Sequence, residues 1–79
     1  MVGERDFIKR LSKAGGKFTK NKKFRYVSQV KFGDLTIDIE HSGKSRYRTT
    51  CCEGNKSSIL GNGDPLSIVY DKTLTKLEL

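Results

Sequence analysis

The spacing of the hydrophobic residues changes at a pair of glycines, Gly15-Gly16, and no other feature of this chain constrains the fold as strongly. Ahead of the glycines the apolar residues recur with the period of one helical face: Phe7, Ile8, Leu11 and Ala14. From Phe24 onward apolar and polar residues alternate, as they do in a strand that buries one face. The chain is therefore expected to join a helix to a sheet.

The first element is expected to be a helix over residues 4–14. Acidic residues fall in its first turn and basic residues in its later turns, which the helix dipole favours. They are Glu4 and Asp6, followed by Lys9, Arg10 and Lys13. The two glycines then supply the positive φ angles of a helix stop. Residues 17–23, with four lysines and no period, are expected to form a basic loop, and the sheet is expected to begin at residue 24.

The first hairpin is predicted from a turn signal and from the faces of its strands. Gly33-Asp34 fits a two-residue type II′ turn, whose first position requires a positive φ angle. Pairing the residues on either side of this turn places nearly every large apolar side chain on one face. The predicted partners are Phe32 and Leu35, Val30 and Ile37, Ser28 and Ile39, and Tyr26 and His41.

The next turn is predicted at Ser42-Gly43-Lys44, as a three-residue loop that leads into residues 45–52. It implies four cross-strand pairs: Tyr47 with Ile39, Thr49 with Ile37, Arg46 with Glu40, and Arg48 with Asp38. The first two pairs lie on the core face and the two charge pairs on the outer face. A two-residue loop would turn both arginines into the core and is rejected for that reason.

Residues 53–64 are expected to be a loop, and residues 65–79 carry two competing signals. The β-rich run at residues 67–70 favours strands, whereas Asp64-Pro65 and the apolar spacing that follows favour a helix. We predict strands. The whole chain, residues 1–79, is then one small α+β domain in which an N-terminal amphipathic helix packs on an antiparallel β-meander of three to five strands. The helical alternative gives an α-β-β-β-α order like that of double-stranded-RNA-binding modules.

The positive charge is concentrated in the first part of the chain. The 79 residues have a formal net charge of +7, and residues 1–31 alone hold ten Lys and Arg against two acidic residues. An excess so localised indicates a surface that contacts a polyanion. The chain is too short for a deep dinucleotide cleft. No window approaches the ~18 apolar residues of a membrane span, and no apolar signal segment is visible, so neither membrane insertion nor secretion is expected.

We therefore predict a small basic module that binds RNA or DNA through its phosphates, without enzymatic activity, metal or cofactor. The expected contacts come from the helix, the basic loop and the outer face of the sheet. They are Lys9, Arg10, Lys13, Lys17, Lys20, Lys22, Lys23, Arg25, Lys31, Arg46 and Arg48. The choice between RNA and DNA is left open, as is the oligomeric state, a dimer included.

A small metal-independent ribonuclease, similar to a toxin, is the first alternative. His41 is the single histidine, and with Glu40 or Arg46 it would supply the acid–base groups and the cation that RNA cleavage needs. The opposing interpretation is that His41 packs beside Tyr26, while Glu40 and Arg46 form a surface pair. The predicted register favours this second interpretation, because it places Glu40 and His41 on opposite faces.

The adjacent Cys51 and Cys52 lack the spacing of a metal site and point to opposite faces of a strand. We expect one core thiol, Cys51, and one outer thiol, Cys52, in the reducing cytoplasm. A third function is a protein-interaction or inhibitor module that binds an acidic partner. The apolar stretch at residues 74–79 motivates it, since an edge strand or exposed helix there would offer a docking surface.

Overall fold

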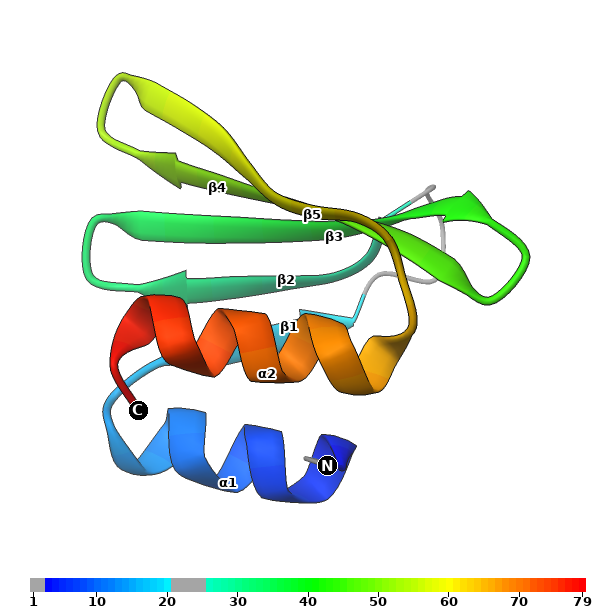
Figure 1. Cartoon of the computed structure of the whole chain (residues 1–79). Coiled ribbons are helices and arrows are strands. Elements are labelled where there is room, and N and C mark those ends of the chain that lie inside the picture. Colours follow the sequence, from blue (N-terminus) through cyan, green and yellow to red (C-terminus); the bar gives the residue numbers. More distant parts are fainter. Residues whose placement is uncertain (1–2, 21–25) are drawn as a thin grey trace.

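The computed structural model describes residues 3–20 and 26–79 of the chain. Within these residues the chain forms two helices and five strands (Figure 1). In chain order they are α1 (Glu4–Lys13), β1 (Lys17–Lys20), β2 (Tyr26–Phe32), β3 (Leu35–Gly43), β4 (Arg46–Glu53), β5 (Lys56–Asp64) and α2 (Leu66–Leu77). The predicted α+β class, with an N-terminal helix and an antiparallel meander, is confirmed.

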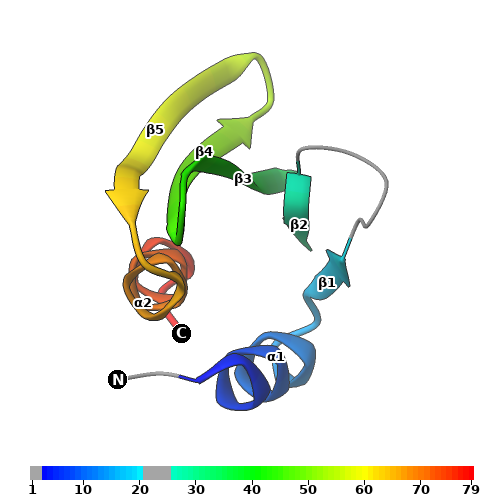
Figure 2. The same ribbon diagram turned by 90° about the vertical axis from the view of Figure 1, so that its right-hand side faces the viewer.

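The five strands form one antiparallel sheet in the order β1-β2-β3-β4-β5. The sheet is strongly curved, and both helices lie on the same side of it (Figure 2). α1 contacts β1, whereas α2 contacts β4 and β5. The inner face of the sheet is therefore covered by helices, and its outer face is covered by neither of them.

α1 agrees with the predicted helix to within one residue and ends in a Schellman motif. Gly15 has a φ angle of +91°. The backbone N–H groups of Gly15 and Gly16 donate hydrogen bonds of 3.1 and 2.9 Å to the carbonyls of Ser12 and Leu11. A Cβ atom at Gly16 would overlap the side chain of Leu11. The glycine pair thus ends the helix and brings the chain close enough to α1 to begin β1.

The β2–β3 hairpin has the predicted register next to its turn. Gly33 has a φ angle of +60°. Three predicted pairs are observed: Phe32 with Leu35, Val30 with Ile37, and Ser28 with Ile39. The fourth is wrong, because the register shifts between Tyr26 and Ser28 and Tyr26 lies opposite Glu40. The alternation of apolar and polar residues predicts which face of the sheet each side chain occupies near the turn. It does not reveal an extra residue inserted further along the strand.

The predicted β3–β4 register is wrong by two residues. The observed pairs are His41 with Tyr47, Glu40 with Arg48, Ile39 with Thr49, Asp38 with Thr50, and Ile37 with Cys51. The turn holds only Lys44 and Ser45, and a register shift between His41 and Gly43 accompanies it. The shift means that β3 contains one extra residue just before the turn. This residue returns the following side chains to the faces that a two-residue turn without a bulge would have exchanged, so both arginines stay out of the core.

Two segments predicted as loops contain strands. Residues 17–20 form β1, because Phe18 packs edge-on against Phe7 of α1, with ring centroids 5.5 Å apart, and this contact holds the segment against β2. The rest of the predicted basic loop, residues 21–23, and the predicted sheet start at residue 24 lie outside the described residues. Residues 56–64 form β5, whose glycine-rich half is accommodated by two register shifts against β4.

The prediction of strands at residues 65–79 is wrong, because this segment contains the helix α2. Its buried residues follow helical spacing: Val69, Tyr70, Thr73, Leu74 and Leu77. The β-favouring Thr73 is accommodated because its hydroxyl donates a hydrogen bond of 2.8 Å to the carbonyl of Val69. Helices at both ends agree with the alternative architecture, although five strands, not three, separate them.

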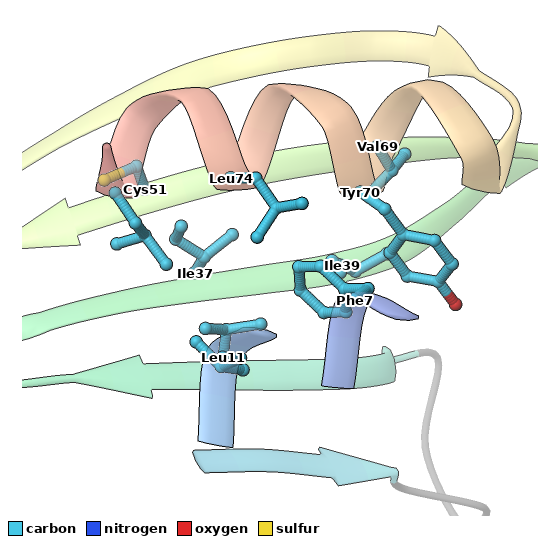
Figure 3. Close-up of a cluster of buried hydrophobic side chains, with 10 residues drawn as sticks. Phe7, Leu11, Ile37, Ile39, Cys51, Val69, Tyr70 and Leu74 are labelled. Carbon is cyan, nitrogen blue, oxygen red and sulfur yellow. The ribbon is translucent and has the colours of Figure 1, made fainter. Parts of the chain in front are cut away.

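The core forms where the two helices meet the inner face of the sheet (Figure 3). Its buried hydrophobic residues are Phe7 and Leu11 of α1, Val30, Ile37, Ile39 and Cys51 of the sheet, and Val69, Tyr70, Leu74 and Leu77 of α2. The ring of Phe7 stacks on Tyr70, with centroids 4.6 Å apart and an interplanar angle of 18°. This contact joins the helices directly beneath the sheet.

Replacement of Leu11 by Ala should lower the free energy of unfolding by about 3 kcal/mol, because Leu11 is fully buried and its loss leaves a cavity. Ile8→Ala is the matched control on the same helix, and since Ile8 is only partly buried it should cost about 1 kcal/mol. Urea denaturation measures both values. Equal losses for the two variants would show that α1 is not anchored through Leu11.

Candidate nucleic-acid interface

Two lysines of α1 project from the helix face opposite the core. Phe7 and Leu11 are buried, and Lys9 and Lys13, one turn apart, are exposed. Arg10 is also exposed, but it forms an ion pair of 3.1 Å with Asp6 on the preceding turn. Lys9 and Lys13, with the exposed Arg5 one turn before Lys9, therefore carry the available positive charge of this helix.

Two further lysines face each other across the first two strands. Lys17 of β1 and Lys31 of β2 are direct cross-strand partners, and both are exposed. They lie on the outer face, because the neighbouring pair, Phe18 and Val30, lies on the core face. Among the described carboxylates, none forms an ion pair with either lysine. Two like charges are thus held side by side without a counter-charge.

Lys20 is positioned differently from Lys17, although both belong to β1. It lies opposite the buried Ser28, on the inner side of the strand, and forms an ion pair with Glu4 at the start of α1. This pair connects the far end of β1 to the helix. Lys20 therefore contributes to the attachment of α1 more than to an external surface.

The predicted extension of the basic surface to Arg46 and Arg48 is not continuous with these lysines. Across the outer face, Lys31 is aligned with Thr36 and then with Cys52 of β4. Arg46 begins β4, six residues before Cys52, which corresponds to roughly 20 Å of extended strand. Arg48 is ion-paired with Glu40 on the neighbouring strand. Lys22, Lys23 and Arg25 lie outside the described residues.

The residues of the predicted ribonuclease site are not assembled. Glu40 points to the outer face, where it binds Arg48 and not Arg46. His41 is on the opposite face, and its ring lies 4.8 Å from that of Tyr47 at an angle of 35°. The alternation of β3 therefore separates the acid from the histidine, as the sequence analysis expected.

Comparison with protein-family models, with curated proteins and with solved structures finds no match. In the part of the chain that is described, no three side chains of His, Cys, Asp or Glu are grouped so that they could hold a metal ion. No helix of residues 3–20 and 26–79 has the length and apolar character needed to cross a membrane. A functional assignment must therefore be argued from the charged surface itself.

The cross-strand pairing of Lys17 with Lys31 is the feature that sequence analysis missed. Both lysines were expected to bind phosphate, but their pairing requires that residues 17–20 form a strand. One signal was present, since Phe18 and Thr19 alternate between apolar and polar with lysines on either side. Four residues are too few for alternation to distinguish a strand from a loop.

Cys51 should be much less reactive than Cys52. Cys51 is buried in the core, and this burial raises the pKa of its thiol, although nearby Lys76 acts in the opposite direction. Cys52 is only partly buried and lies on the outer face. A disulfide reagent should therefore modify one thiol quickly in the folded protein. Cys52→Ser should remove the fast phase and Cys51→Ser should retain it; the reverse pattern would contradict the orientation of β4.

The folded protein should lose stability between about pH 10 and pH 12 because of Tyr70. Burial raises the pKa of Tyr70 to about 12, and the negative charge of Glu4 adds to the effect. Since the pKa in the folded state lies above the unfolded value, the stabilising contribution is complete below pH 10 and disappears as the pH passes about 12. Absorbance titration of the folded protein should show a late phenol that is absent in Tyr70→Phe. Identical titration curves above pH 10 for the parent and Tyr70→Phe, apart from the loss of one phenol at about pH 10, would contradict this.

Proposed function

We propose that this protein is a small, non-enzymatic module that binds RNA or DNA through the backbone phosphates. The observation that carries the proposal is the cross-strand pairing of Lys17 with Lys31 on the outer face of the sheet. Lys9 and Lys13 on the solvent face of α1 supply further positive charge, and α1 contacts β1. Cys51 is buried, Cys52 is partly buried, and both are free thiols. Free thiols of this kind support a reducing, cytoplasmic location.

Like charges placed directly opposite each other on a sheet oppose folding, by a few tenths of a kcal/mol up to about 1 kcal/mol. A phosphate group between the two lysines converts this repulsion into two attractive contacts. Binding along a nucleic-acid backbone also releases condensed counterions, which adds a favourable term that is largely independent of sequence. The arrangement is therefore suited to a polyanion and has little need of base recognition.

Protection of a sheet edge is a competing explanation for lysines on edge strands. It accounts for Lys17 and Lys20, since β1 is an edge strand. It does not account for Lys31, because β2 is an interior strand with neighbours on both sides. A lysine on an interior strand, aligned with a lysine on the edge, favours ligand binding over edge protection.

The double variant Lys17→Ala/Lys31→Ala should weaken binding to RNA or DNA by roughly tenfold at low salt. It should also lower the slope of log affinity against log salt by about 1 to 2, because two phosphate contacts are lost. Fluorescence anisotropy with single- and double-stranded RNA and DNA across a salt series measures both. Lys44→Ala/Lys56→Ala is the matched control: it removes two exposed lysines elsewhere and should retain the parental slope.

Two results would contradict the proposal. One is that none of the four nucleic acids binds at low salt, and the other is that both double variants lose affinity equally. Gel analysis of the recovered nucleic acid tests the ribonuclease alternative in the same samples. Intact strands agree with a binding module, whereas cleavage that disappears in His41→Ala would assign the protein to the ribonucleases.

A further inference from the structure

The two edge strands of the sheet differ in how well they are protected. β1 has four residues with lysine at both ends, a pattern that discourages pairing with another strand. β5 is the other edge and has nine residues, and its central run at residues 57–61 carries no charge. An edge of this length without charged residues is open to strand addition.

The part of β5 next to its turn is regular. Gly54-Asn55 forms a two-residue turn, and residues 56–59 pair with β4 without a register shift. In such a hairpin the residues that flank the turn share hydrogen bonds, so the backbone groups of Lys56 and Ser58 point toward β4. Those of Ser57 and Ile59 alternate with them and point away from the sheet. Register shifts occur only beyond Ile59.

The side chains of this segment leave its edge accessible. Residues 56–59 are all exposed, and Ile59 is 62% exposed, the largest value among the exposed large hydrophobic residues of the described chain. Ile59 lies opposite Thr50, on the outer face that the helices do not cover. A partner strand on this edge would therefore cover apolar surface as well as pair with the backbone groups.

The charge distribution favours a second copy of this chain as the partner. A net charge of +7 would oppose self-association if it were spread evenly. The excess lies in residues 1–31, however, whereas residues 49–79 hold three basic and four acidic residues. β5 and β1 also form the two opposite edges of the sheet (Figure 2). Two copies can approach through β5 with their lysines at opposite ends.

We propose that β5 pairs antiparallel with β5 of a second copy, about a two-fold axis that passes through Ser58. Ser57 then lies opposite Ile59 of the partner subunit, and Ile59 opposite Ser57 of the partner subunit. Because these residues have outward-pointing backbone groups, they exchange hydrogen bonds on both sides of the axis. The two isoleucines lie diagonally across the new junction, within contact of each other. The two sheets become one antiparallel sheet of ten strands.

A charge at Ile59 should separate the two copies. Ile59→Lys places a lysine on each side of the axis, so the apparent mass should fall from dimer to monomer at concentrations where the parent is a dimer. Ile68→Lys is the matched control, since Ile68 is an exposed isoleucine that belongs to α2 and not to β5. Light scattering after size-exclusion chromatography measures the masses, and circular dichroism checks that each variant is folded. A parent that is monomeric at all concentrations, or equal behaviour of the two variants, would overturn the proposal.

Crosslinking tests the position of the axis. In a Cys51→Val/Cys52→Ser background, Ser58→Cys should form a covalent dimer on mild oxidation, because the two new thiols face each other across the axis. Ser57→Cys should not, since those residues lie about 7–8 Å apart on the diagonal. Selective crosslinking through residue 58 supports the proposed register. Crosslinking through residue 57 alone, or through neither position, contradicts it.

Discussion

The structure depends on the stacking of Phe7 on Tyr70 beneath a curved sheet. A single helix is too narrow to cover the inner face of five strands, and α1 and α2 do so only together. The stacked rings, 4.6 Å apart, set the contact between the helices. The ring of Phe18 then packs perpendicular to that of Phe7, which places β1 at the margin of the sheet. The position of the lysines on β1 therefore follows from an aromatic contact in the core.

Sequence reasoning predicted the local structure best where the period was clear and the chain was regular. The spacing of Phe7 and Leu11 defined α1, and the Gly33 turn fixed three pairs of the β2–β3 hairpin. The errors in register arose at inserted residues. One extra residue in a strand shifts every later cross-strand pair, and the amino-acid composition does not show where such a residue lies. In α2, β-favouring residues such as Val69 and Thr73 concealed a helix that tertiary packing stabilises.

The charged surface was predictable in composition but not in geometry. The sequence places most of the positive charge in the first 31 residues, yet three of the expected cations are bound within the molecule: Arg10 by Asp6, Lys20 by Glu4, and Arg48 by Glu40. Those pairings depend on the distance between α1 and β1 and on the β3–β4 register. A count of charges cannot distinguish cations that form ion pairs within the fold from cations that face solvent. The register of the strands makes this distinction, because it shows which charged residues are neighbours.

The position of β1 at the edge of the sheet also determines how the protein would respond to the length of its ligand. In a ten-stranded assembly joined through β5, the two copies of β1 are the outermost strands, separated along the sheet by nine strand spacings, or about 40 Å. If the lysine pairs bind phosphate as proposed, a short oligonucleotide would reach only one of them. A longer one would reach both, so that the second contact would form at high effective concentration. The meander would thereby give a very small chain a minimum ligand length for tight association.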